Sequence, residues 1–338
     1  MPEERVLMVR DAINEALRQE MQRDASVILL GEDVAGGAGR PAGGGAEAWG
    51  GAFAEYRGLQ SEFGAERVLD TPISEMGYLG AAVGAAATGL RPVAELMFVD
   101  FVGVCLDQVM NQAAFMHYMS GGRAKVPLTL ITHIGAGIGM AAQHSKVLYS
   151  FFAHIPGLKV VAPSSAYYAK GLLISAIRDD DPVVYCLHKL LLGRSEPVPE
   201  EAYEFPIGRA RVVREGRDVT LIGAALTTKV CLDAAQALQE DGIDAEVVDL
   251  LSLSPLDEET VLASVRRTGR AVVVDEGFPR CGLAADVASL IAEQAFDHLD
   301  GPVKKVTAPH SPVPFSRPLE MAFMPSAARV REAVQQLF

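Results

Sequence analysis

Three ionisable side chains stand where chemistry is expected in an α/β protein. Glu75 follows the turn formed by residues 71–74, where an apolar strand at 67–69 ends. Proline keeps its preceding residue out of the helix and serine is a favoured N-cap, so a helix is predicted to start at Ser74. Glu75 then lies in the first helical turn, either as a reactive carboxylate or simply as an acid stabilised by the helix dipole.

Glu32 and His144 also follow predicted strands. Residues 27–30 form a short apolar run typical of a buried parallel strand, and Glu32 comes just after it. Ligands of open α/β sheets bind outside the carboxyl ends of strands, although Glu32 could equally be a solvated loop acid. His144 follows a glycine-rich loop at 135–139, where an imidazole suits proton transfer or is an ordinary polar loop residue.

The helix that follows Glu75 has almost no side-chain bulk. Its small residues predict that its backbone can approach another helix very closely. They are Gly77, Gly80, Ala81, Gly84 and Ala85.

Composition excludes several classes of protein. The chain has 338 residues with 49% hydrophobic content and a formal net charge of −13, which argues against nucleic acid and anionic membrane partners. The N-terminus is charged, and the longest apolar run, residues 76–90, is too short to span a bilayer. We therefore expect a soluble cytoplasmic protein. The four cysteines are widely spaced in apolar contexts, which predicts free, buried thiols.

Strands and helices alternate along the chain and predict an α/β fold of two doubly wound domains. The expected boundaries are a first domain at 1–191, a proline-rich linker at 192–206 and a smaller domain at 207–338. Residues 254–257 predict a capping box with Pro255 at the first helical position. The glycine-rich stretch 35–51 is either a functional or a disordered loop.

Common catalytic motifs are missing. The run 135–139 reads GxGxG, but Met140 stands where a dinucleotide fingerprint needs its third glycine, and no acid follows about 20 residues on. The sequence contains no GxxxxGK[ST], HExxH or GxSxG pattern. P-loop, zinc protease and hydrolase functions therefore lose their main support.

Many motifs in one register resemble the β subunit of the thiamine diphosphate-dependent first component of 2-oxo acid dehydrogenase complexes. They span essentially the whole chain, and residues 49–51, 154–156 and 308–316 look closest to acetoin dehydrogenase. The shared segments are 31–34, 70–77, 91–97, 100–101, 107–108, 118–122, 143–145, 156–161, 169–172 and 181–183. The resemblance implies a transketolase-like pyrimidine-binding domain followed by a transketolase C-terminal-like domain.

The resemblance also implies roles for individual residues. Glu75 matches the carboxylate that contacts N1′ of the cofactor aminopyrimidine, and Phe101 matches the aromatic ring on the pyrimidine, with Ile73 and Met97 beside it. Glu32 matches a second acid that couples active sites. His144 matches the histidine that serves the intermediate and the incoming lipoyl group. A structural potassium ion would be held by Leu128, Ala176, Asp179 and Asp181.

One motif of such enzymes is absent from the sequence. The cofactor diphosphate and its Mg²⁺ are normally held by Gly-Asp-Gly and a later Asn, and no Gly-Asp-Gly occurs in this chain. The resemblance therefore implies an α subunit that supplies this half of the site, in an assembly of two α and two β chains. A lipoyl-bearing dihydrolipoamide acyltransferase is the further partner that it implies.

The expected function is the β subunit of an acetoin dehydrogenase, and three alternatives stay open. These are a pyruvate or branched-chain 2-oxo acid dehydrogenase β subunit, a related thiamine-dependent carboligase, and a non-catalytic β-like scaffold. The chain also departs from the family pattern at positions where charged or polar residues are common, which suggests a polar cluster exchanged for apolar packing. The departures are Phe115, Ile131, Leu187, Leu192 and Leu251.

Overall fold

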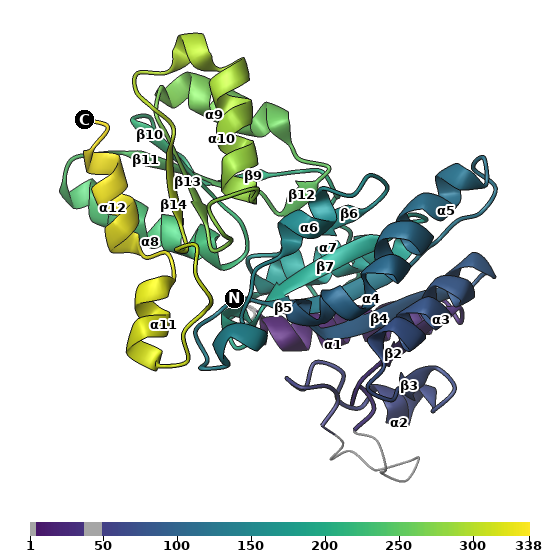
Figure 1. Ribbon diagram of the computed structural model, residues 1–338. Coiled ribbons are helices and arrows are strands. Elements are labelled where there is room, and N and C mark those ends of the chain that lie inside the picture. The colour runs from purple at the N-terminus through teal and green to yellow at the C-terminus, as the bar shows by residue number, and fades with distance from the viewer. Residues whose placement is uncertain (1–4, 37–48) are drawn as a thin grey trace. The chain divides into compact units, whose positions relative to one another are not determined.

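The computed structural model describes residues 5–36 and 49–338, which fold into two compact α/β units (Figure 1). The first unit comprises the chain up to His133 together with Phe151–Leu187 and Leu191–Ile207. The second comprises Ile134–Ser150, His188–Leu190 and Gly208–Phe338. Most of the glycine-rich stretch 35–51 lies outside the described residues.

The first unit is built on a twisted sheet with the strand order β6-β7-β5-β4-β2-β3. Strand β2 pairs in parallel with both β3 and β4, so the carboxyl ends of all three lie at the same edge. β2 and β4 are nearly continuous runs of apolar residues, as is typical of strands buried on both faces of a sheet. The bounds are β2 (Val27–Gly31), β3 (Val68–Asp70), β4 (Arg91–Phe98), β5 (Thr129–Ile134), β6 (Lys159–Val161) and β7 (Val183–His188).

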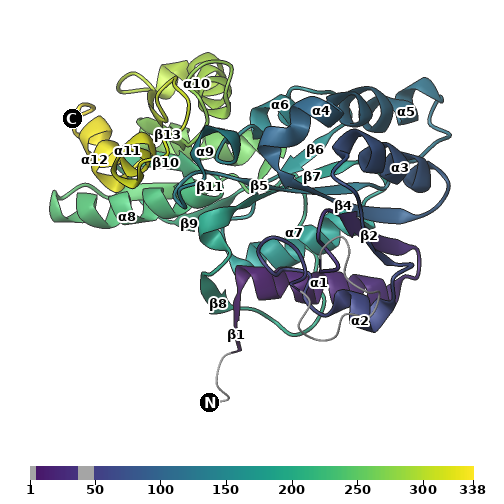
Figure 2. The same cartoon turned by 60° about the horizontal axis from the view of Figure 1, so that its bottom comes forward.

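Helices cover both faces of this sheet, as the predicted doubly wound fold requires (Figure 2). On one face lie α1 (Val9–Arg23) and α7 (Ala166–Arg178), and on the other α3 (Glu75–Ala87), α4 (Val102–Asp107) and α5 (Ala114–Met119). Shorter helices are α2 (Leu59–Phe63) and α6 (Tyr149–Ala153). Helix α4 continues into α5 through a π-helical stretch at Gln108–Ala113.

The segment 192–206, expected to link the domains, packs on the first unit. It contains β8 (Ser195–Pro197), which pairs antiparallel with β1 (Val6–Met8). The fully buried Lys170 ammonium donates to the carbonyls of Pro199 and Glu200 at 2.7 and 3.0 Å. This buried cation is thus satisfied by main-chain oxygens of the segment together with the Glu15 carboxylate, to which it donates at 2.6 Å.

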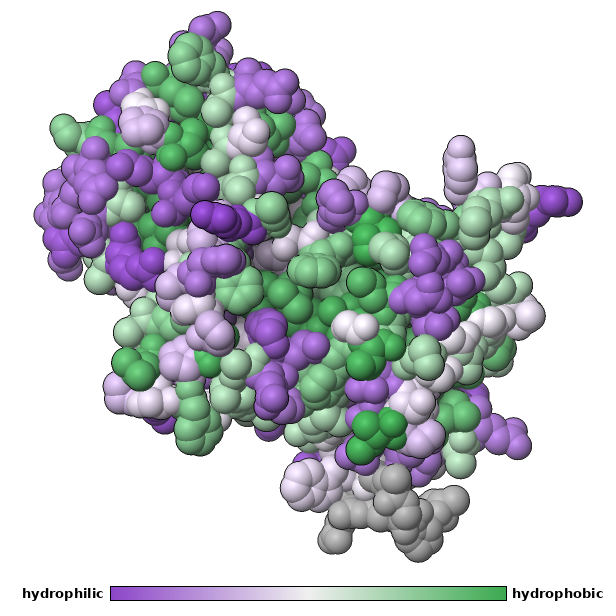
Figure 3. Space-filling model, in the orientation of Figure 1, coloured by the Kyte–Doolittle hydropathy of each residue, from purple (hydrophilic) through white to green (hydrophobic). Residues whose placement is uncertain are grey.

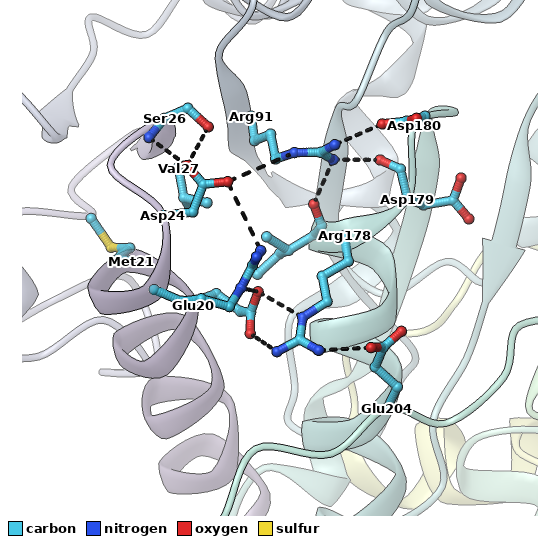
Figure 4. Close-up of polar contacts among 12 residues, drawn as sticks. Glu20, Met21, Asp24, Ser26, Val27, Arg91, Arg178, Asp179, Asp180 and Glu204 are labelled. Carbon is cyan, nitrogen blue, oxygen red and sulfur yellow. Dashed lines mark hydrogen bonds and ion pairs between the residues drawn. The ribbon is translucent and has the colours of Figure 1, made fainter.

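An arginine network ties α1 to α7 (Figure 4). The Arg178 guanidinium donates to both oxygens of the fully buried Glu20, at 3.0 and 2.6 Å, and to Glu204 at 2.6 Å. Nearby, Arg91 donates to the Asp180 carboxylate and to the carbonyls of Ile177 and Asp179. Arg178 therefore joins the two helices that cover one face of the sheet.

The second unit has the strand order β14-β13-β10-β11-β9, with β9 antiparallel. Helices α8 and α12 pack on one face around a core that includes Leu221, Val272 and Val330, and α9 and α10 lie on the other (Figure 1). The strands are β9 (Arg211–Arg214), β10 (Val219–Gly223), β11 (Ala245–Asp249), β12 (Ser252–Ser254), β13 (Ala271–Asp275) and β14 (Lys304–Thr307). The helices are α8 (Leu226–Glu240), α9 (Glu258–Thr268), α10 (Leu283–Gln294), α11 (Arg317–Phe323) and α12 (Ala327–Gln335).

Two local predictions are wrong. The cap of α9 is Asp257, whose carboxylate accepts from the Thr260 amide, so Pro255 precedes the helix and follows a cis peptide bond. Cys281 is exposed, whereas the other three cysteines are free and buried as expected.

Within residues 5–36 and 49–338, every helix falls short of the length and apolarity that crossing a membrane requires.

Removing the Glu20 carboxylate tests the network between α1 and α7. We expect Glu20→Ala to lower the free energy of unfolding by about 2–4 kcal/mol, because Arg178 keeps a partly buried charge without its main partner. The matched control is Glu204→Ala on the opposite side of Arg178. Glu204 is 54% exposed, so its loss should cost less than about 1 kcal/mol. Equal losses in urea unfolding would contradict this account.

Candidate active site

The register of the first sheet brings Glu32 and the turn before Glu75 to the same edge. Gly31, the last residue of β2, is aligned with Asp70, the last residue of β3. The Thr71 amide then donates to the Gly31 carbonyl at 2.9 Å, which fixes the turn against the end of β2. Each acid therefore leaves the sheet at a carboxyl end, where ligands of open α/β sheets bind.

Glu75 is the first residue of α3, as the sequence predicted. Ser74 occupies the N-cap position, but its hydroxyl makes no capping bond, and its carbonyl accepts from the Gly77 and Tyr78 amides. The Glu75 side chain is half-buried in the first turn, where helix amides favour a negative charge. It is thus held at the sheet edge by a turn that leaves its carboxylate accessible.

Glu32 is more deeply buried, with 7% of its surface exposed. Its Oε1 has no hydrogen-bond partner among the described residues. Burial raises the pKa of Glu32 to about 6, with further contributions from the charges of Glu75 and Asp33. The influence of Glu75 on this pKa places the two acids in one electrostatic site.

The apolar residues expected at the cofactor come from the neighbouring strand and turn. Met97 lies near the end of β4, and Phe101 ends the 3₁₀ turn Val99–Phe101 that follows. Phe98 meets the Phe101 ring edge-to-face, with the centroids 5.7 Å apart. Ile73 is 85% exposed in the turn before α3. An aromatic ring and two apolar side chains thus lie at or just after the ends of β4 and β3, at the same sheet edge as the two acids.

A buried polar cluster lies beneath this edge, and sequence analysis missed it. His133, at β5, contacts the Glu55 carboxylate at 2.6 Å through Nε2 and the Met97 carbonyl at 2.8 Å through Nδ1. Burial raises the pKa of Glu95, whose Oε1 lies 4.0 Å from His133 Nδ1. Burial lowers the pKa of His133, but the Glu55 carboxylate outweighs this and the net shift is upward. The sequence signal that could have indicated this cluster is Glu95, an acid among the apolar residues of β4.

The residues expected around potassium lie together in the first unit, with a lysine among them. Lys159 Nζ lies 2.8 Å from both Asp179 oxygens and 3.0 Å from Asp181 Oδ2. The carbonyls of Leu128 and Ala176 accept main-chain hydrogen bonds. Within the described part of the chain, no group of three or more His, Cys, Asp or Glu side chains is arranged to hold a metal ion. Potassium here stays a prediction.

His144 belongs to the second unit, within the segment Ile134–Ser150. It is half-buried and follows the short 3₁₀ turn Ala141–Gln143. Its carbonyl accepts a hydrogen bond from the Lys189 ammonium, also in the second unit. The structure thus groups Glu32, Glu75 and the predicted apolar residues at one edge of the first sheet and assigns His144 to a loop of the second unit. Leu128 and Asp181 instead precede β5 and β7, at the amino ends of these strands.

Comparison with known proteins identifies the family. Residues 5–194 match the transketolase pyrimidine-binding domain, and residues 208–330 match the transketolase C-terminal domain. The chain is 54% identical over 332 residues to the acetoin:2,6-dichlorophenolindophenol oxidoreductase subunit beta of Cupriavidus necator, covering 98% of this chain and 97% of that one. The chain belongs to the family of β subunits of thiamine diphosphate-dependent 2-oxo acid and acetoin dehydrogenases.

Two further relatives give the range of this family. The Bacillus subtilis protein with the same name is 51% identical over 98% of this chain and 97% of its own. The pyruvate dehydrogenase E1 component subunit beta of Rickettsia felis is 43% identical, with 98% of each chain covered. The chain is thus a thiamine diphosphate-dependent oxidoreductase β subunit, more similar to these acetoin oxidoreductases than to this pyruvate dehydrogenase. A β subunit implies an α partner.

A solved structure with a related fold is the split-gene transketolase, described as an inactive beta4 tetramer. It has a TM-score of 0.77 and 25% sequence identity, and the match covers 98% of each chain. The predicted fold of two transketolase-like α/β domains is confirmed for this β subunit.

The raised pKa of Glu32 predicts a pH-dependent stability difference. The unfolded carboxyl has its ordinary pKa of 4.5 and the folded one a pKa of about 6, so the folded chain holds more protons in this window. Stability due to Glu32 therefore falls as the pH rises from 4.5 through 6. We expect Glu32→Gln, which cannot ionise, to raise the free energy of unfolding at pH 8 by up to about 2 kcal/mol. The gain should shrink towards zero near pH 4.5.

Urea unfolding at a series of pH values measures this difference. Glu66→Gln is the control, because Glu66 is exposed and its replacement should give no pH-dependent gain. A Glu32→Gln effect that stays the same from pH 4.5 to pH 8 would contradict the raised pKa.

Proposed function

We propose that this chain is the β subunit of an acetoin dehydrogenase that cleaves acetoin and passes an acetyl unit to a lipoyl group. The observation that supports this most is the pair of acids at one sheet edge, in a chain that is 51–54% identical to two acetoin oxidoreductase β subunits. In this reaction the bond between the carbonyl and carbinol carbons of acetoin breaks and acetaldehyde leaves. The remaining two-carbon unit is oxidised by two electrons as the lipoyl disulfide is reduced, which gives an acetyl thioester.

The side chains at the sheet edge fit the aminopyrimidine end of thiamine diphosphate. Glu75 offers a half-buried carboxylate for a ring nitrogen, and buried Glu32 adds an oxygen without a partner among the described residues. Phe101, with Ile73 and Met97, offers apolar surface for the ring. When bound, the cofactor supplies the carbanion chemistry that adds to a carbonyl. In our proposal Glu75 holds or returns the proton at the pyrimidine nitrogen, and Glu32 tunes the charge beside it.

We infer that the α partner holds the cofactor diphosphate and Mg²⁺, because this sequence contains no Gly-Asp-Gly motif. An apolar area on the face that carries α3 and α4 supports a large subunit interface there (Figure 3). Met76 and Val104 are exposed on these helices, and a Cβ added at Gly84 or Gly103 would meet no other atom within 4 Å. Small, exposed residues of this kind permit the close helix approach of obligate interfaces. We propose an assembly of two α and two β chains.

We propose that the acyltransferase component delivers its lipoyl group to His144. A half-buried imidazole on a loop can exchange a proton with the incoming sulfur. Potassium at Leu128, Ala176, Asp179 and Asp181 is a further, separate proposal. The Lys159 ammonium already lies on both carboxylates, so the ion would be held chiefly by carbonyl oxygens or would displace the lysine.

Substrate choice is tested by mixing the chain with its α partner and measuring dichlorophenolindophenol reduction. We expect kcat/KM for acetoin to exceed that for pyruvate and for branched-chain 2-oxo acids by at least about tenfold, roughly 1.4 kcal/mol of transition-state discrimination. Faster turnover of pyruvate would favour the second candidate, a pyruvate dehydrogenase β subunit, which the 43% identical Rickettsia felis relative represents. Adding lipoylated acyltransferase then tests acetyl transfer against carboligation.

Glu75 is tested by the isosteric change Glu75→Gln. An amide cannot hold and return the proton, so we expect kcat to fall by about 10²–10⁴-fold. Assembly with the α partner, followed by size-exclusion chromatography, should be unchanged. The control Glu66→Gln should keep full activity, since Glu66 is exposed and precedes the amino end of β3, whereas the site lies at the carboxyl end of that strand. Near-normal turnover of Glu75→Gln would be fatal to the assignment.

A further inference from the structure

The loop that carries His144 points three main-chain amides at two buried carboxylates of the second unit. The Ala136 amide donates to Glu276 Oε1 at 2.6 Å, and the Gly137 amide donates to Glu320 Oε1 at 2.8 Å. The Gly139 amide donates to Glu320 Oε2 at 3.0 Å. Glu276 follows β13, and Glu320 lies on α11 with no exposed surface. Amides that cradle phosphate in other glycine-rich loops are here occupied by carboxylates of the same chain.

Glu276 also contacts His188–Leu190, a short segment that belongs to the second unit together with the loop. The Leu190 amide donates to His188 Nδ1 at 3.2 Å, so the ring proton lies on Nε2 and is donated to Glu276 Oε2 at 2.9 Å. The hydrogen bonds thus run from the Ala136 amide through Glu276 and His188 to the Leu190 amide, and the main-chain amides at the two ends can only donate. Glu276 must therefore accept at both oxygens, which only a carboxylate can do.

Glycines let the loop lie directly against this segment. Gly135 and Gly137 have φ values of 95° and 108°, where side chains other than glycine are strained. A Cβ at Gly135 would lie 2.0 Å from His188 Nε2, and one at Gly137 would lie 2.5 Å from Leu190 Cδ1. The loop and the segment 188–190 thus form one packed unit around Glu276.

The same segment contacts His144 itself. Lys189, between His188 and Leu190, is buried and donates to the His144 carbonyl. Within the loop, the Gly135 amide donates to the Lys146 carbonyl at 3.0 Å, which brings the chain just after His144 back to the glycine run. The placement of His144 therefore depends on Glu276 and Glu320 through a few direct hydrogen bonds.

We propose that Glu276 and Glu320 are positioning residues for the reaction, and that they hold the glycine-rich loop so that His144 is presented to the incoming lipoyl group. This inference rests on the proposed function of His144, whereas the anchoring of the loop stands on the contacts alone. Neither acid touches substrate or cofactor in this account. They act through the loop amides, through His188 and through Lys189.

The test compares Glu320→Ala, Glu320→Gln and Glu276→Gln in the full chain with its α partner. Hydrogen exchange of the peptide covering 134–150 reports anchoring, and we expect it to accelerate at least tenfold in Glu320→Ala. Acetyl transfer to the lipoyl acceptor should fall by about 10- to 100-fold, the effect of a small misplacement of a catalytic group. Glu320→Gln keeps an oxygen that can accept from both loop amides, as Glu320 Oε1 does at 2.8 and 3.2 Å, and should restore part of the transfer. Glu276→Gln leaves one oxygen for two separate donors, Ala136 and His188, and should not.

A double-mutant cycle with His144→Ala separates positioning from general damage to the fold. If Glu320 acts through His144, then Glu320→Ala should cause no further loss of transfer in the His144→Ala background. The control Glu332→Ala, at an exposed position on α12, should leave both exchange and transfer unchanged.

Three outcomes would count against the inference. Unchanged exchange at 134–150 in Glu320→Ala would overturn the anchoring, and a full additional loss in the His144→Ala background would overturn positioning. A wild-type complex that transfers no acetyl group would instead overturn the proposed function and, with it, the role of His144. In that case the exchange measurement still decides whether the two acids hold the loop.

Discussion

The parallel register of β2, β3 and β4 is the constraint from which the site follows. Gly31 is aligned with Asp70, so β2 and β3 end together, and β4, in which Ala94 is aligned with Leu30, continues in the same direction to Phe98. Whatever follows them is brought to one edge, and here that includes two acids and an apolar surface. Burying Glu32 beside Glu75 costs solvation and adds repulsion, which is why Glu32 holds its proton more tightly than an ordinary glutamic acid. The fold maintains this unfavourable pair because the surrounding strands fix it.

Interior packing is consistent with a β subunit that has exchanged charge for apolar contacts. Ile131 in β5 and Leu187 in β7 are buried on adjacent strands, and from the sequence we expect both to be departures from the family pattern. Such an exchange can be nearly neutral for stability, because the attraction within a buried ion pair barely offsets its desolvation. A different buried pair, Glu55 with His133, lies at the carboxyl end of β5. A buried polar pair thus lies close to the site edge.

Local signals in the sequence predicted the elements, and long-range contacts account for what they missed. Short apolar runs gave the parallel strands correctly, and the Pro72-Ser74 pattern gave the start of α3 at Glu75. The cap of α9 was misplaced because Asp257 competes with Ser254 for that role, and local pattern cannot rank them. The site acids could be found from the strand ends and the family motifs. The partners of the glycine-rich loop could not, since Glu276 and Glu320 lie about 140 and 180 residues away in the sequence.

We propose that this chain supplies one end of the thiamine diphosphate site and that an α subunit supplies the other. Calorimetric titration of thiamine diphosphate with Mg²⁺ into the chain alone, the α partner alone and their mixture tests this most directly. We predict saturable, tight binding in the mixture, with much weaker binding to either chain by itself. Tight binding accompanied by turnover of acetoin in the isolated chain would contradict it.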